Sequence, residues 1–323
     1  MTCAHLTPIR IGVVGLGKIA RDQHLPTILQ SEDFEIAFLV DKTVQTALDA
    51  PHFRSLEDAL QSGIGFDAVS LCTSPQPRLQ LFEHLLVHAC SILLEKPPAG
   101  TFAQAAQIGE QVGRSRANIF TAWHSRFAPE VDTARTWMAT RELSSGRIEW
   151  RENAEKWHPG QDWLWREGGF GVFDPGMNAV SILTELLPGE VLSVGAGQLA
   201  IPENSDTPTV AGFQLLARGA PIDIEFEFHD RDEETWTIEL RATDGSSMLL
   251  SQGGAAISID CGPVTHSVSN EYASIYERFA KLVRSGQSDF DAEPLRIIDQ
   301  VFAKAARKQI APLPNRFFQS RAL

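Results

Sequence analysis

The chain has 323 residues, of which 43% are hydrophobic and 21% charged, and it carries a formal net charge of -13. This length and composition indicate a globular protein of about two domains. The negative charge argues against nucleic acid and against an anionic membrane as partners, because both call for clustered Lys and Arg to meet phosphate charge.

The cysteines show neither CxxC spacing nor the density of a disulfide scaffold, so we expect free thiols in a reducing cytosol. They are Cys3, Cys72, Cys90 and Cys261. The sequence also has no apolar run of about eighteen residues and no signal-peptide core near Met1. These features predict a cytoplasmic protein that does not bind a membrane.

In the first part of the chain, short apolar runs alternate with amphipathic stretches, which predicts a doubly wound parallel sheet covered by helices on both faces. The expected strands are 9–14, 34–40, 66–72, 91–94 and 118–122. The expected helices are 18–30, 44–49, 56–62, 77–89 and 102–114. We therefore expect a Rossmann-type domain over residues 1–123.

The pattern changes after Trp123, where we expect a second domain over residues 124–323. Helices are predicted at 130–141 and 175–187, on either side of an irregular, aromatic-rich segment at 150–165. Strand patterns follow at 191–200, 209–217, 222–229, 234–242, 247–251 and 255–259, and helices at 274–285 and 294–307 close the chain. Because only short turns separate these strands, we expect an antiparallel sheet.

A glycine-rich loop, Gly15-Leu16-Gly17-Lys18-Ile19-Ala20, follows the first expected strand. Gly15 allows a tight turn, Gly17 lets the main chain approach a pyrophosphate, and Ala20 lets the helix pack closely on the strand. The free N–H groups at the helix start favour the negative charge of the ligand. The loop predicts dinucleotide binding.

The second expected strand ends at Asp41-Lys42, which bears on the choice of dinucleotide. A carboxylate at this place can accept hydrogen bonds from the ribose hydroxyls and repels a 2′-phosphate, so Asp41 favours NAD. The ammonium of Lys42 could attract the same phosphate, which keeps NADP open. A solvated pair at the strand end is the alternative.

Lys96 follows the apolar run 91–94 as part of Glu95-Lys96-Pro97. In an open α/β sheet, ligands bind at the carboxyl ends of the strands, so we expect this lysine beside the dinucleotide. Glu95 can orient the ammonium, and we interpret Lys96 as a group that transfers a proton. A solvent-exposed lysine at a strand end is the alternative.

The motif Phe173-Asp174-Pro175-Gly176-Met177-Asn178 marks the start of a helix. Asp174 could simply cap that helix, with Pro175 in its first turn. Asp174 and Asn178 stand four residues apart, so their side chains can also point to one ligand from the same helix face. Asp174 could therefore cap the helix, take part in catalysis, or do both.

The aromatic segment 150–165 combines tryptophans with carboxylate, imidazole and amide groups. Aromatic faces and planar polar groups are what a carbohydrate site uses, and Glu152, Trp157 and His158 are its candidates here. For Trp163 and Trp165, a small aromatic core is an equal alternative. A zinc site from His124, His158 and Asp174 is conceivable, but no zinc-binding spacing supports it, so we expect no metal.

These motifs resemble those of the glucose-fructose oxidoreductase and inositol dehydrogenase family (Gfo/Idh/MocA) over nearly the whole chain. The resemblance implies a Rossmann domain followed by an α/β domain with an open antiparallel sheet. Further stretches at 17–26, 121–126, 157–161 and 171–176 are similar to bacterial L-arabinose/D-galactose 1-dehydrogenases. That likeness implies Lys96 and Asp174 as the catalytic pair.

The same resemblance assigns the remaining site residues. The implied sugar contacts are His124, Glu152, Trp157, His158, Asn178 and Trp236. The implied cofactor contacts are Gly15, Gly17, Lys18, Ile19, Asp41, Lys42, Ser74, Pro75, Glu95 and Lys96. The turn at 74–77 lacks the histidine that many family members carry just beyond it.

The expected activity is oxidation of C1 of a pyranose, L-arabinose or D-galactose, to the aldonolactone with NAD or NADP as hydride acceptor. The alternatives are another sugar or inositol dehydrogenase of the family, and a non-catalytic sensor that binds the dinucleotide. We also expect a homodimer that pairs through the outer face of the antiparallel sheet, where we place Phe226 and Phe228.

Overall fold

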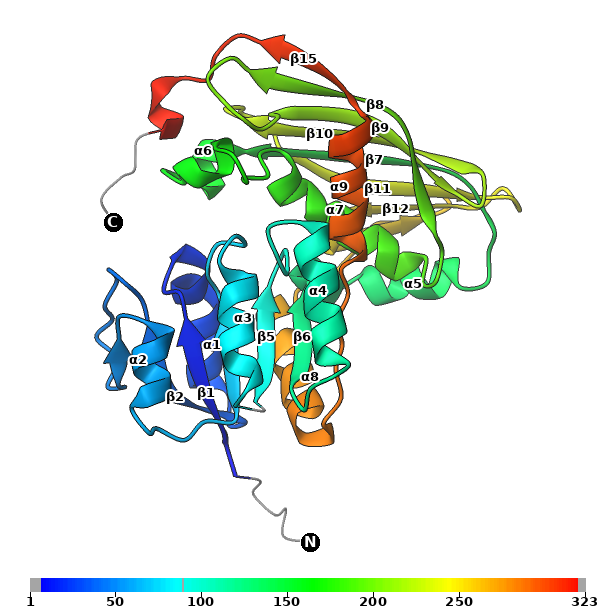
Figure 1. Ribbon diagram of the computed structural model, residues 1–323. Helices are drawn as coiled ribbons and strands as arrows, with labels where there is room; N and C mark the ends of the chain where they lie inside the picture. The colour runs from blue at the N-terminus through cyan, green and yellow to red at the C-terminus, as the bar shows by residue number, and fades with distance from the viewer. Residues whose placement is uncertain (1–6, 89, 319–323) are drawn as a thin grey trace, which may run out of the picture. The chain divides into compact units, whose positions relative to one another are not determined.

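The computed structural model describes residues 7–88 and 90–318, so the expected free thiol of Cys3 lies outside the described residues. The chain divides into two units, each with its own sheet (Figure 1). Unit 1 holds the described residues up to His124 together with Asn270–Ala292, and unit 2 holds Ser125–Ser269 and the described residues from Glu293 onward. None of the helices in the described residues has the length and apolar character needed to cross a membrane.

Unit 1 is built on a six-stranded parallel sheet in the order β3-β2-β1-β4-β5-β6. Its strands are β1 (Ile9–Val14), β2 (Phe34–Val40), β3 (His52–Phe53), β4 (Ala68–Leu71), β5 (Ser91–Glu95) and β6 (Asn118–Ala122). This order confirms the Rossmann-type prediction. It reverses direction between β1 and β4, which is where such sheets bind their ligands.

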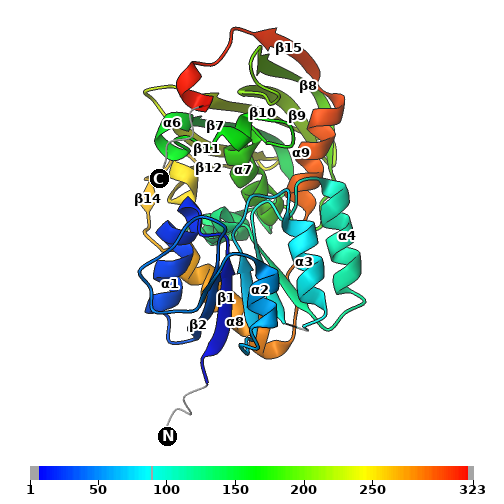
Figure 2. The ribbon, with the colours of Figure 1, turned by 60° about the vertical axis from the view of Figure 1, so that its left-hand side comes forward.

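Helices cover both faces of this sheet. They are the π-helical turn η1 (Ala20–His24), α1 (Leu25–Gln30), α2 (Leu56–Gln61), α3 (Arg78–Leu86), α4 (Phe102–Val112) and α8 (Glu271–Ser285). Figure 2 shows α3 beside α4 on one face, and α1 beside α8 on the other. The helix expected at 44–49 is wrong: Asp41 accepts hydrogen bonds from the N–H groups of Thr43 and Val44 and holds this stretch as a loop.

Helix α8 corrects the predicted domain boundary, because residues 270–292 belong to unit 1 rather than to the second domain. The apolar side of α8 packs on aromatic side chains of the parallel sheet. Phe279 stacks on Phe34 and on Phe120, at centroid distances of 6.1 and 6.2 Å. The helix begins after Asn270, whose side chain accepts the N–H groups of Tyr272 and Ala273, and the segment completes the unit 1 core.

Unit 2 contains a nine-stranded sheet in the order β14-β13-β12-β11-β7-β10-β9-β8-β15. The strands are β7 (Leu143–Asn153), β8 (Leu192–Pro202), β9 (Val210–Ala217), β10 (Ala220–His229), β11 (Thr235–Ala242), β12 (Ser247–Ser251), β13 (Ala256–Ile259), β14 (Thr265–His266) and β15 (Ala306–Ile310). Neighbouring strands are antiparallel except for β10 with β7 and β15 with β8. The sheet is therefore mixed, and it includes three strands that the sequence analysis missed: β7, β14 and β15.

Helices of unit 2 cover one face of this sheet (Figure 1). They are α5 (Val131–Met138), α7 (Phe173–Leu186) and α9 (Glu293–Lys304), while α6 (Ala154–Trp157) and the short turns η2 (His124–Phe127), η3 (Asp162–Trp165), η4 (Gln252–Gly254) and η5 (Asn315–Phe318) complete the connections. The prediction that Phe226 and Phe228 lie on the outer face is wrong. Both are fully buried on the helix-covered face, where Phe226 meets Phe173 of α7.

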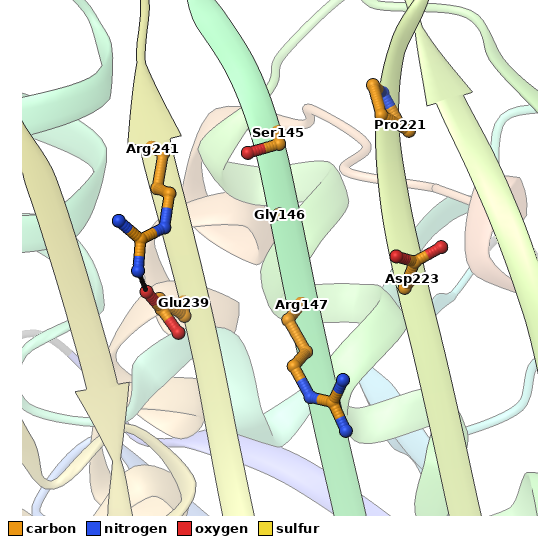
Figure 3. Close-up of a pocket in the computed structure, with 7 residues that line it drawn as sticks. All are labelled: Ser145, Gly146, Arg147, Pro221, Asp223, Glu239 and Arg241. Atoms are coloured by element: carbon orange, nitrogen blue, oxygen red, sulfur yellow. Dashed lines mark hydrogen bonds and ion pairs between the residues drawn. The ribbon is translucent and has the colours of Figure 1, made fainter. Parts of the chain in front are cut away.

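The other face of the unit 2 sheet is charged. Arg147 of β7 contacts Glu149 on its own strand and Glu225 on the neighbouring strand β10. Arg241 contacts Glu239, both from β11 (Figure 3). A pocket here is lined by Ser145, Gly146, Arg147, Pro221, Asp223, Glu239 and Arg241 (Figure 3). It contains none of the predicted site residues. An apolar dimer interface through this face therefore has no support from Phe226 and Phe228.

Candidate functional site

The glycine loop between β1 and η1 has the conformation that a dinucleotide needs. Gly15 has φ +90°, and a Cβ atom there would lie 2.8 Å from the main-chain nitrogen of Thr73, so only glycine fits the turn. At Gly17, a Cβ atom would meet no described atom within 4 Å. The main chain at Gly17 is thus open to close approach by a ligand, at the start of the helix that runs from residue 18 to residue 30.

Asp41 connects the end of β2 to this loop. One carboxylate oxygen accepts the N–H of Leu16 at 2.8 Å, and the other accepts the N–H groups of Thr43 and Val44. Partial burial would raise the pKa of Asp41, but the main-chain N–H groups of Val44, Thr43 and Leu16 lower it. Asp41 therefore keeps a negative charge beside the loop. Its hydrogen bonds to main-chain N–H groups argue against the alternative that Asp41 and Lys42 are merely a solvated pair at the strand end. Lys42 next to it is exposed.

Other predicted cofactor residues lie around the same sheet edge. Lys18 is exposed and bonds Asp22 at 2.5 Å, and Ile19 is 37% exposed. Ser74 and Pro75 follow β4 by a few residues, as expected for the edge where parallel strands end. The residues present fit a bound dinucleotide, because this edge combines a cradle at Gly17 with a helix start.

Two threonines that the sequence analysis did not name lie at this edge. The hydroxyl oxygens of Thr73, just after β4, and Thr121, near the end of β6, are buried without a hydrogen-bond partner among the described residues. Buried hydroxyls usually have a partner, so these two are candidates for hydrogen bonds to a ligand group. A sequence signal exists only for Thr73, which directly follows an apolar strand.

Lys96 directly follows β5, which lies between β4 and β6 in the parallel sheet. Its expected place at the carboxyl end of a strand is confirmed. The side chain is half-buried, and the Lys96–Pro97 peptide bond is cis. Glu95 was expected to orient the ammonium, but its Oε2 accepts the main-chain N–H of Lys96 at 2.7 Å. The described contact of Glu95 with this lysine is therefore made to the backbone.

His124 follows β6 by two residues, as the first residue of η2, and is the last residue of the first segment of unit 1. Its Nδ1 is 2.6 Å from a carboxylate oxygen of Glu271, and its ring stacks on Tyr272 at a centroid distance of 5.9 Å. The imidazole is about one-fifth exposed. This acidic partner, contributed by α8, fixes the ring orientation.

In unit 2, Asp174 lies in the first turn of α7. The helix begins at Phe173 with Val172 at its N-cap, so the interpretation of Asp174 as the N-cap residue is wrong. Asp174 is only 4% exposed, and its Oδ2 lies 3.7 Å from Nε2 of His158. Asn178 follows one turn later on the same helix and is half-buried. Asp174 therefore lies within the first turn of α7, with its carboxylate close to His158.

Glu152 and Trp236 come from adjacent strands, β7 and β11, on the helix-covered face of the sheet. The indole N–H of Trp236 donates to Glu152 Oε2 at 3.2 Å. Glu152 Oε1 lies 3.8 Å from Nε2 of His158. The imidazole thus faces two carboxylates, those of Glu152 and Asp174, at distances longer than a direct hydrogen bond, and a hydroxyl group can bridge such distances.

Aromatic rings flank this polar group. Trp157 is 41% exposed and meets Trp236 edge to face at 6.2 Å. Phe228 of β10 meets the ring of His158 at 5.4 Å. Trp165 is 2% exposed and stacks on Phe228. Of the two alternatives for Trp165, sugar site or small aromatic core, it therefore belongs to the aromatic core.

Five of the predicted residues therefore meet within unit 2: Glu152, Trp157, His158, Asp174 and Trp236. We call them the unit 2 cluster. Within residues 7–88 and 90–318, no group of three or more His, Cys, Asp and Glu side chains is arranged to hold a metal ion.

Comparison with known proteins connects these features. Residues 9–121 match the family model described as "Oxidoreductase family, NAD-binding Rossmann fold" (GFO_IDH_MocA). The chain is 37% identical to galactose 1-dehydrogenase of Pseudomonas fluorescens over 306 residues. The aligned residues make up 94% of this chain and 98% of the relative. The chain belongs to the Gfo/Idh/MocA oxidoreductase family.

Solved structures of similar proteins agree with this membership. A D-galactose-1-dehydrogenase from Rhizobium etli matches with a TM-score of 0.89 and 36% identity, over 96% of this chain and 99% of that one. A 3-ketoreductase from Actinomadura kijaniata, in complex with NADP and TDP-benzene, matches with a TM-score of 0.81 over 94% and 99% of the two chains. At 17% identity, this second structure supports the fold alone.

The sequence analysis also missed residues of this Gfo/Idh/MocA protein that hold the predicted site residues in place. Glu234 accepts the indole N–H of Trp157 at 2.5 Å and also pairs with Lys156. Tyr272 donates to Glu95 at 2.5 Å. Glu234 could have been found from its place two residues before Trp236, but Tyr272 lies 176 residues beyond Lys96 and carries no local signal.

Proposed function

We propose that the protein is an NAD(P)-dependent aldose 1-dehydrogenase that oxidises C1 of L-arabinopyranose or D-galactopyranose to the aldonolactone. Two relatives that cover nearly the whole chain at 36–37% identity are galactose 1-dehydrogenases, which supports this activity. The two sugars share their configuration at C2 to C4 and differ by one exocyclic CH₂OH group. A site open at that carbon accepts both.

The unit 2 cluster is the observation that carries the proposal. Two carboxylates, those of Glu152 and Asp174, and the imidazole of His158 offer hydrogen-bonding groups at 3.7–3.8 Å spacing. The indole rings of Trp157 and Trp236 stand beside them. Sugars present hydroxyls on their edges and C–H groups on their faces, so a polar centre with aromatic neighbours matches a pyranose.

The reaction removes a proton from the C1 hydroxyl and a hydride from C1, and leaves a C1 carbonyl. The dinucleotide, when bound, supplies the hydride acceptor. We assign removal of the proton from the C1 hydroxyl to Lys96 and Asp174. General base catalysis of this kind contributes roughly 10²–10⁴-fold in rate. Gly15 and Gly17 bind the pyrophosphate, Asn178 and His124 bind sugar hydroxyls, and the charge of Asp41 supports a preference for NAD over NADP. A cytoplasmic location and a homodimer stay predictions.

A panel of aldoses and cyclitols, assayed by NADH and NADPH absorbance, tests this function. We expect turnover with L-arabinose and D-galactose, and its loss in Lys96→Ala with dinucleotide binding retained. Turnover of inositol alone, without any aldose, would contradict the proposed substrate. Binding of NAD without turnover of any sugar would instead identify a sensor.

A further inference from the structure

A buried polar cluster lies under Lys96 in unit 1. Glu95 is 3% exposed, and its two carboxylate oxygens serve different partners. Oε2 accepts the main-chain N–H of Lys96 at 2.7 Å. Oε1 accepts the hydroxyl of Tyr272 at 2.5 Å and lies 3.0 Å from Nε2 of His24. A single carboxylate thus joins the lysine backbone to η1 and α8.

This carboxylate is charged in the folded protein. Burial alone would raise the pKa of Glu95, but the hydrogen bond and charge of His24, the charge of His124 and the hydroxyl of Tyr272 outweigh burial and lower the pKa to about 2. Burial raises the pKa of Tyr272 well above its usual value, and the neighbouring charge of Glu95 adds to that rise. Tyr272 therefore stays protonated and acts as a hydrogen-bond donor to a carboxylate.

His24 is held from the opposite side. It is fully buried, and its Nδ1 lies 2.8 Å from the hydroxyl of Tyr276, which in turn lies 3.0 Å from the hydroxyl of Ser70. Burial alone would lower the pKa of His24, but Cys72, Tyr276 and Glu95 raise it well above the usual value. The two tyrosines of the chain are thus both in this cluster, one turn apart on α8.

The cluster is a poor means of stabilising the fold. Desolvation of two buried charges costs about as much as their attraction returns, and apolar side chains of the same volume often stabilise a core better. A buried charged group that contacts the backbone of a functional residue instead fixes geometry. The contact that matters here is the one to the N–H of Lys96.

Arg78 fixes the same segment through its carbonyl groups. The guanidinium is 3% exposed, and it donates to the main-chain oxygens of Glu95 and Pro97, and also to that of Thr73. The backbone on both sides of Lys96 is therefore anchored. Of these anchors, only the carboxylate depends on a residue from the distant segment 270–292.

We propose that Tyr272 is a positioning residue for Lys96: together with His24 it holds the Glu95 carboxylate against the Lys96 N–H and so fixes where the ammonium is presented. The inference rests on the proposed function, in which Lys96 takes part in proton transfer. Loss of the Tyr272 hydroxyl leaves the carboxylate with one donor fewer and loosens the lysine backbone. A misplacement of about 1 Å can cost on the order of 10²-fold in rate.

Tyr272→Phe and Tyr276→Phe form a matched pair, since each removes one buried hydroxyl from α8 and only the first contacts Glu95. We expect Tyr272→Phe to lower kcat roughly ten- to hundredfold, with the dissociation constant of NADH changed less than about threefold. Tyr276→Phe should lower kcat less than about threefold. An equal loss of kcat in both variants, in step with equal losses in melting temperature, would show a general effect on stability and overturn the inference.

A double-mutant cycle tests whether Tyr272 acts through Glu95. Glu95→Gln keeps the size of the side chain and removes its charge, and it also serves if Tyr272→Phe fails to fold. We expect the double variant to have a kcat within about twofold of Glu95→Gln alone, because a Gln amide has one acceptor oxygen and cannot accept from both the Tyr272 hydroxyl and the Lys96 N–H, so the link between them is already broken. Fully multiplicative losses would overturn the proposed route.

Lys96→Ala, measured in parallel, separates this inference from the proposed function. Turnover in Lys96→Ala would refute the catalytic role of the lysine and the inference with it. Loss of turnover in Lys96→Ala, together with unchanged kcat in Tyr272→Phe, would refute the positioning role alone.

Discussion

Gly176 tests how closely helix α7 must lie on its sheet. A Cβ atom at this position would stand 2.5 Å from Cδ2 and 2.6 Å from Cε2 of Phe226. Phe226 is fully buried and packs against Phe173 and Phe213, so its ring has no free direction in which to move. Gly176→Ala must therefore push the start of α7 away from β10.

The energy of this change is the difference between two effects. Alanine favours a helix over glycine by up to about 1 kcal/mol. Overpacking a tight core costs about 1–3 kcal/mol. We expect a net destabilisation of about 1–2 kcal/mol, which lowers the melting temperature by roughly 2–8 °C for a unit of this size. Because Asp174 lies two residues before Gly176, kcat should also fall roughly tenfold or more.

Thermal unfolding followed by tryptophan fluorescence suits this measurement, since six of the seven tryptophans belong to unit 2. Phe226→Leu is the control, because it removes the ring edge that the new methyl group would meet. The double variant should recover part of the stability and of kcat, with a coupling of about 1 kcal/mol. A Gly176→Ala protein with higher stability than the wild type and full kcat would refute the close packing of α7 on β10.

Three further predictions concern the other parts of the site. Burial raises the pKa of Tyr272 and of Tyr276, so their stabilising effect is present below pH about 10 and is lost as the pH rises through the folded values. Absorbance at about 295 nm should then show tyrosinate only together with unfolding, and half of the signal appearing near pH 10 in the folded protein would contradict this. Gly15→Ala, which forces an L side chain to φ +90° against Thr73, should weaken NADH binding about tenfold in a fluorescence titration and lower stability by about 1–3 kcal/mol; unchanged binding would show that the turn tolerates a side chain. Trp236→Phe removes the donor to Glu152 and should raise the sugar KM about tenfold while the NADH dissociation constant stays constant, and an unchanged KM would remove Trp236 from the sugar site.

Local patterns in the sequence were enough to predict the Rossmann-type sheet. Lys96 could be placed at a strand end because the apolar run 91–94 precedes it directly, and parallel strands end at one edge. The position of Gly15 directly after β1 likewise predicts a turn. In each case the information lies within a few residues of the position.

Features that depend on distant packing could not be predicted in the same way. A period of two places Phe226 and Phe228 on one face of β10, but only the packing of α7 decides which face is buried. Strand β7 was missed because Arg147, Glu149 and Arg151 alternate with its buried residues and lower its apolar character. The contact of Tyr272 with Glu95 joins segments 177 residues apart.

The return of residues 270–292 to unit 1 has a consequence for how this chain can be divided. A fragment that ends at His124 would contain every strand of the unit 1 sheet and the glycine loop, yet Phe34 and Phe120 would lose Phe279, and Glu95 would lose its tyrosine. During synthesis, the dinucleotide-binding unit is completed only after the strands β7 to β14 have been made. Any exchange of this unit with that of a relative must therefore carry two separate pieces of the gene.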